Sequence, residues 1–127
     1  MNNKMLHPQE IEVWYIIPSI RREIAIEMKN KGISQKKIAE FLGVSEPAIS
    51  QYFAHKRAKD ISLGYKIKKE VVISVNAIIT DNSVVLYEIQ RLIDLNETKN
   101  IICQIHRKQS NIYKNCKICF ENEKHIS

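Results

Sequence analysis

The chain has 127 residues, of which 44% are hydrophobic, and it carries a formal net charge of +6 at pH 7 with a pI near 9.3. This length suits one domain, or one small domain with an extension, and the basic balance favours an anionic partner such as nucleic acid. No apolar run approaches the roughly 20 residues of a membrane span, and the N-terminus lacks the apolar core of a signal peptide. We therefore expect a cytoplasmic protein without a membrane partner, in which the three cysteines do not form structural disulfides.

The first thirty residues predict two helices, over about 8–16 and about 19–30, with an interruption at Pro18. Apolar residues at helical spacing are expected to pack inside, and the second helix is expected to brace the motif that follows it. These residues are Ile11, Val13, Trp14 and Ile17 in the first helix and Ile20, Ile24 and Met28 in the second.

Residues 34–57 (SQKKIAEFLGVSEPAISQYFAHKR) predict two short helices joined by a tight turn. Ser34 and Ser45 are placed to cap the two helices, because a serine hydroxyl accepts from an early backbone N–H. Gly43 tolerates the positive φ that ends the first helix, and Pro47 suits the first turn of the second. The predicted inner faces consist of Ile38, Ala39, Phe41 and Leu42 in the first helix and Ala48, Ile49, Tyr52 and Phe53 in the second.

This stretch resembles the Xre/Cro-repressor family of helix-turn-helix DNA-binding domains over about residues 20–60. The residues that carry the resemblance are Gln35, Ile38, Ala39, Leu42, Gly43, Val44, Ser45, Ile49, Ser50, Tyr52 and the Lys56–Arg57 pair. The resemblance implies that the second helix, about 46–54, enters the major groove of double-stranded DNA. A two-fold homodimer on a palindromic site is the physical expectation for this class, because each recognition helix contacts only a few base pairs.

The residues at the family's base-contact positions are Ser45, Glu46, Pro47, Ser50 and Gln51. Gln51 is the strongest single candidate, because an amide can pair bidentately with adenine, and Glu46 could accept from the amino group of cytosine. Gln35 matches the position where the family holds a phosphate. Further phosphate partners, which carry little sequence information, are expected at Lys36, Lys56 and Arg57.

Two more helices are predicted, over about 63–80 and about 84–96, with a turn at residues 81–83. Their apolar residues are Ile67, Val71, Val75, Ile78 and Ile79 in the first and Val85, Leu86, Ile89, Leu92 and Ile93 in the second. The β-branched run 71–75 makes a strand the main local alternative. So much aliphatic surface predicts dimerisation, and the alternative is that these helices fold back on the N-terminal domain.

All three cysteines lie near the C-terminus, where Cys103 and His106 are one helical turn apart and Cys116 and Cys119 form a CxxC pair. This paired spacing is typical of tetrahedral Zn²⁺ sites, and the same thiolates could hold an iron–sulfur cluster. The arrangement also resembles that of some helix-turn-helix regulators, and this resemblance implies a three-cysteine cluster that senses oxidation or cluster supply. A redox dithiol and inert cysteines are the remaining alternatives. We expect Zn²⁺ or an iron–sulfur cluster that stabilises or switches the protein.

Together these patterns predict an all-α protein with a DNA-binding domain over 1–60, dimerisation helices over 61–98 and a cysteine-rich segment over 99–127. The expected function is that of a homodimeric transcriptional regulator. The alternative is an antitoxin-type DNA-binding protein whose C-terminal half binds a protein partner, with a purely structural zinc. With only three glycines and no Ser/His/Asp set, neither an enzyme nor a small-molecule substrate is expected.

Overall fold

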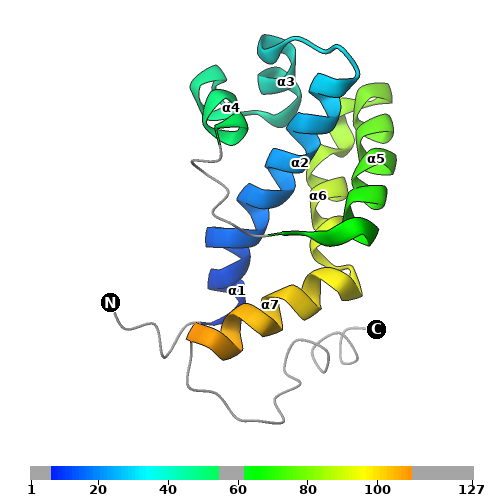
Figure 1. Cartoon of the computed structure of the whole chain (residues 1–127). Coiled ribbons are helices and arrows are strands. Elements are labelled where there is room, and N and C mark those ends of the chain that lie inside the picture. Colours follow the sequence, from blue (N-terminus) through cyan, green and yellow to red (C-terminus); the bar gives the residue numbers. More distant parts are fainter. Residues whose placement is uncertain (1–6, 55–61, 110–127) are drawn as a thin grey trace.

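The computed structural model describes residues 7–54 and 62–109, which are helical and contain no strand (Figure 1). The elements are α1 (Pro8–Ile11), the π-helical turn η1 (Glu12–Ile16), α2 (Ile17–Asn30), α3 (Gln35–Leu42), α4 (Glu46–Phe53), α5 (Gly64–Thr80), the 3-10 turn η2 (Asn82–Val84), α6 (Val85–Ile93) and α7 (Asn96–Gln109). The predicted all-α class is confirmed, and residues 71–75 lie within α5 rather than in a strand. Across the described part of the chain, no helix combines the length and apolarity that a bilayer span requires.

The first three elements follow one another without the interruption expected at Pro18. Pro18 lies in the first turn of α2, directly after the five-residue turn η1. A proline inside an α-helix lacks a donor and crowds the carbonyl four residues earlier, which here belongs to η1. A π turn is wider than an α turn, and it gives the chain room to pass this point as a helix.

The π turn also changes which apolar residues are buried. Ile11 and Ile16 are both fully buried, although they are five positions apart, because a π turn brings residues at this spacing onto one face. Val13 and Trp14 are instead 58% and 50% exposed, so the prediction that they pack inside is wrong. The buried face continues along α2 at ordinary helical spacing through Ile20, Ile24 and Met28.

α2 lies at the centre of the fold, with α3 and α4 packed on one part of it and α5 and α6 on another (Figure 1). α7 crosses the ends of the other helices and contacts α1, η1, α5 and α6. The apolar face predicted for α5 is buried in this core, except that Ile79 is 39% exposed. The core contributions of α5 and α6 are Ile67, Val71, Val75 and Ile78 and, from α6, Ile89, Leu92 and Ile93.

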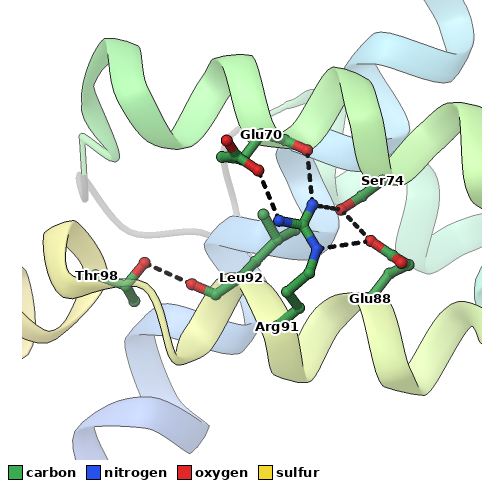
Figure 2. Close-up of polar contacts among 6 residues, drawn as sticks. All are labelled: Glu70, Ser74, Glu88, Arg91, Leu92 and Thr98. Atoms are coloured by element: carbon green, nitrogen blue, oxygen red, sulfur yellow. Dashed lines mark hydrogen bonds and ion pairs between the residues drawn. The ribbon is translucent and has the colours of Figure 1, made fainter.

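A polar cluster joins α5 to α6 beside this core (Figure 2). Arg91 Nη1 donates to Glu70 Oε1 at 2.6 Å, and its Nε donates to Glu88 Oε1 at 3.0 Å. Ser74 Oγ accepts from Arg91 Nη2 at 2.8 Å and donates to Glu88 Oε1 at 2.7 Å. Ser74 and Glu88 are buried, so these bonds satisfy polar groups that the packing of α6 on α5 removes from water.

Candidate nucleic-acid interface

Both helices of the predicted motif begin at the serine that the sequence indicates. The Ser34 hydroxyl accepts from the backbone N–H of Lys37 at 3.2 Å, and the Ser45 hydroxyl accepts from that of Ala48 at 3.2 Å. Each serine has an extended backbone, as an N-cap requires. The starts of α3 and α4 are therefore fixed by local sequence.

The turn between α3 and α4 closes on Gly43. Its φ of 66° lies in the left-handed region, which a residue with a Cβ adopts only at a cost. The N–H of Val44 then reaches back to the carbonyl of Ala39 at 3.1 Å, and that of Gly43 reaches Glu40 at 3.3 Å. These two bonds form the helix-ending motif that glycine favours, and they set the bend between the two helices.

The apolar faces of α3 and α4 meet each other and α2. Most of the residues predicted for these faces are buried, and the two phenylalanines are partly buried at the edge of the core. The buried ones are Ile38, Ala39 and Leu42 in α3 and Ala48, Ile49 and Tyr52 in α4. This packing leaves one side of α4 open to solvent.

The open side of α4 carries every residue predicted to contact bases. Ser45, Glu46, Pro47, Ser50 and Gln51 are all exposed, and all lie at the cap or along this eight-residue helix. An exposed helix edge with hydroxyl, carboxylate and amide groups offers both donors and acceptors to a partner. The structure thus brings together, on one surface, side chains that could read the edges of base pairs.

Gln35 lies at the start of α3 and reaches across to α4. Its Nε2 donates to the carbonyl oxygen of Glu46 at 3.2 Å and also to the hydroxyl oxygen of Ser50. Lys36, the next residue of α3, is exposed. The other two predicted phosphate partners, Lys56 and Arg57, lie outside the residues that the structure describes.

Two cationic residues of α2 hold the C-terminal end of α4, and the sequence did not indicate either of them as part of this surface. Arg22 Nε donates to the carbonyl oxygen of Tyr52 at 3.0 Å, and Lys29 Nζ lies 4.6 Å from the centre of the Phe53 ring. Positions 22 and 29 share one face of α2, which is the only signal that local sequence offers. The partners on α4 become visible only once the two helices are packed.

Half of the predicted metal-ligand set falls within the described residues. Cys103 is half-buried and His106 is 9% exposed, and both lie in the second half of α7. Cys116 and Cys119 lie outside the described residues. Within 7–54 and 62–109, no group of three or more His, Cys, Asp or Glu side chains is arranged to hold a metal ion.

Comparison with known families agrees with the geometry of α3 and α4. Residues 24–69 match a family model described as helix-turn-helix, of the Xre/Cro-like type, which begins within α2 and ends within α5. No curated protein and no solved structure was found to match the chain. Residues 24–69 therefore form an Xre/Cro-like helix-turn-helix domain, which supports a DNA-binding regulator.

Proposed function

We propose that the protein is a sequence-specific transcriptional regulator of the cytoplasm that binds double-stranded DNA as a homodimer and inserts α4 into the major groove. The observation that carries this proposal is the exposed edge of α4, on a helix whose opposite face is fixed by α2 and α3. A helix packed against two others presents its exposed side chains in a defined geometry, which discrimination between base pairs requires.

Each exposed residue of α4 has chemistry suited to a part of the contact. The amide of Gln51 can pair bidentately with adenine, and the carboxylate of Glu46 can accept from the amino group of cytosine. Pro47 offers shape and contact with a thymine methyl group. Lys36, together with Lys56 and Arg57, would neutralise phosphates and position the helix without reading sequence.

Exposed apolar side chains on α5 and α6 support the homodimer. Large side chains on the outer faces of these helices remain in solvent in the single chain, and a second copy would cover them. They are Val72 (38% exposed), Ile73 (56%), Ile79 (39%), Leu86 (76%) and Tyr87 (69%). The molecular mass in solution, measured by analytical ultracentrifugation, should be twice that of the chain, and Leu86→Ser with Ile73→Ser should lower it toward that of one chain.

The same surface carries the second candidate function. An antitoxin-type regulator would use this exposed apolar surface to bind a different protein. A chain that remains monomeric when it is bound to DNA would favour this function. In that case the serine variants would leave the mass unchanged. The molecular mass of the wild type and of the serine variants in solution therefore distinguishes the two functions.

A metal or cluster on the C-terminal segment is part of the proposal. The support is chemical: Cys103 and His106 lie three residues apart on α7, a spacing that directs a thiol and an imidazole the same way along a helix. Cys116 and Cys119 would complete a four-ligand set. Protein purified without oxygen should contain about one Zn²⁺ per chain if the site is structural, or show visible absorbance and iron if it holds a cluster.

The DNA-binding proposal is tested by selecting operators from a random duplex library with the full chain. The expected result is a palindrome whose half-sites are centred about 34–36 Å apart, one helical turn of DNA. Binding that is tight but shows no sequence preference would contradict it. Selection of a single half-site would be consistent with base recognition by α4 but would contradict binding as a homodimer.

A further inference from the structure

The amide of Gln35 is held in one orientation by two acceptors on α4. The carbonyl oxygen of Glu46 can only accept a hydrogen bond, so the Gln35 atom that lies 3.2 Å from it must be the nitrogen. The same nitrogen contacts Ser50 Oγ. An amide nitrogen only donates, and Ser50 is therefore the acceptor in this pair.

The Ser50 hydroxyl can still donate its own proton in a hydrogen bond. A serine hydroxyl has one proton and two lone pairs, and Gln35 occupies one lone pair. Serine in a helix commonly donates to the carbonyl four residues earlier, but that carbonyl belongs to Glu46, whose two lone pairs already accept from Gln35 and from the helical N–H of Ser50. Over residues 7–54 and 62–109 the structure shows no acceptor for this proton, and Ser50 is exposed.

We propose that Gln35 sets the polarity of Ser50, so that Ser50 meets DNA as a hydrogen-bond donor and selects an acceptor. The inference rests on the proposed entry of α4 into the major groove and deepens it by assigning a direction to one contact. Acceptors in that groove are guanine N7 and O6, adenine N7 and thymine O4, whereas cytosine presents a donor. A phosphate oxygen is the other acceptor within reach of such a surface.

The arrangement also changes the role expected for Gln35. Its two amide protons are both engaged, one on Ser50 and one on the Glu46 carbonyl, so neither is left for a phosphate. Gln35 is thus a positioning residue, which acts on DNA through Ser50. Its substitution should alter which base is preferred at one position more than it alters total affinity.

The first test compares operators selected by the full-length wild type and by Ser50→Ala. One position of each half-site should lose its preference, and in the wild type this position should be guanine, adenine or thymine. Loss of the bond should weaken binding to the wild-type operator about tenfold. Base analogues that lack the acceptor are 7-deazapurine for N7 and 2-aminopurine for guanine O6. Such an analogue should weaken DNA binding by the wild type as much as Ser50→Ala does, and it should leave DNA binding by Ser50→Ala unchanged.

The second test reverses the polarity. In Gln35→Glu a carboxylate replaces the donor, so Ser50 gives its proton to residue 35 and meets DNA with a lone pair. The preferred base should then shift toward cytosine or adenine, whose N4 and N6 amino groups donate. Preferences are compared within each variant, which removes the uniform loss of affinity that a new negative charge causes. In Gln35→Ala the hydroxyl is free to rotate, and the preference should broaden.

Matched controls separate this effect from a general disturbance. Gln90 of α6 makes the same kind of exposed amide contact, with its Nε2 3.1 Å from Asp94 Oδ1, and Gln90→Ala should leave both consensus and affinity unchanged. Thermal melts of each variant establish that it is folded before binding is measured.

The outcomes distinguish the polarity from the proposed function. Ser50→Ala could instead weaken binding to all sequences alike, and a methylphosphonate at one phosphate could abolish the difference in affinity between wild type and Ser50→Ala. Ser50 is then still a donor, and its acceptor is that phosphate. If Ser50→Ala relaxes one position but Gln35→Glu and Gln35→Ala leave it unchanged, the polarity proposal is overturned and reading by α4 survives. It is equally overturned if the position is a G·C pair and the analogues that lack guanine N7 or O6 leave wild-type binding unchanged. If neither Ser50→Ala nor Gln51→Ala changes the consensus, α4 does not read bases.

Discussion

Arg22 of α2 donates a hydrogen bond from Nε to the backbone carbonyl oxygen of Tyr52, in the last turn of α4, over 3.0 Å. The last carbonyls of any helix have no partner within it, and they carry the negative end of the helix dipole. A guanidinium at this point satisfies one of them and interacts favourably with the dipole. The end of α4 that is farther from its Ser45 cap is therefore held by a residue of α2.

Arg22→Ala should reduce stability. The Arg22 side chain is only 16% exposed, and its removal leaves the Tyr52 carbonyl without this donor. A hydrogen bond from a charged group contributes about 1.5–3 kcal/mol, so we expect the free energy of unfolding in urea to fall by about this amount. Lys31→Ala, an exposed cation on the same stretch of chain, is the control and should change stability by less than about 0.5 kcal/mol. Equal effects of the two substitutions would show that the carbonyl contact contributes nothing.

Arg91→Ala should be more damaging. It strips partners from Glu88 and Ser74, which are 8% and 0% exposed, and leaves the Glu88 carboxylate buried between α5 and α6 without a counter-charge from Arg91. Breaking a buried ion pair from one side costs about 3–5 kcal/mol, and the 29% exposure of Arg91 places the expected loss near the lower end, about 3 kcal/mol. Glu88→Gln in the Arg91→Ala background removes the stranded charge and should recover part of the stability. No recovery in the double variant would contradict this cause.

Glu12 should make the protein less stable above acidic pH. Burial in η1 and then the charge of Asp94 raise the pKa of its carboxyl above the usual 4.5, with Lys99 opposing them. An acid whose pKa rises on folding holds its proton more tightly in the folded state, so stability declines as pH increases from about 4.5 through the folded pKa. Glu12→Gln should therefore stabilise the protein at pH 7, by less than about 1 kcal/mol for a half-exposed group.

Denaturation at several pH values checks this sign. The difference between wild type and Glu12→Gln should vanish as the pH falls below about 4.5, where both side chains are neutral. Glu40→Gln, on the exposed face of α3, is the matched control. A gain in stability that is the same at pH 4 and pH 7 would contradict the electrostatic explanation.

Features set by neighbouring residues were predictable from sequence, and features set by packing were not. Ser34, Gly43 and Ser45 act on backbone groups within five residues, so capping chemistry was enough to place α3, the turn and α4. The exposed edge of α4 followed from the apolar spacing of its other face. The all-α class followed in the same way.

The unpredicted features need the tertiary arrangement. Arg22 and Tyr52 are 30 residues apart in the chain, and no periodicity in either helix indicates that they meet. The same holds for Gln35 and Ser50, which belong to different helices. The exposure of Trp14 was missed for another reason, because the prediction assumed 3.6 residues per turn through a segment that forms a π turn.

Lys36→Ala and Lys56→Ala should weaken binding to every DNA sequence alike. A lysine that neutralises one phosphate contributes through counterion release, so each loss should flatten the slope of log K against log salt by about 0.9. Binding titrations at four salt concentrations, on the selected operator and on a scrambled duplex, measure this. Lys108→Ala, on the exposed part of α7, should leave the slope unchanged. A change in base preference for Lys36→Ala would instead place that residue on a base.

The measurement that tests recognition by α4 most directly is a binding titration of wild type and Gln51→Ala against the selected operator and its single-base variants. Loss of a bidentate amide–adenine pair should cost about 1–3 kcal/mol on the operator. The cost should disappear when one particular base pair is changed, because the wild type has then lost the same contact. Discrimination that is the same for both proteins at every position would contradict the insertion of the exposed edge of α4 into the major groove.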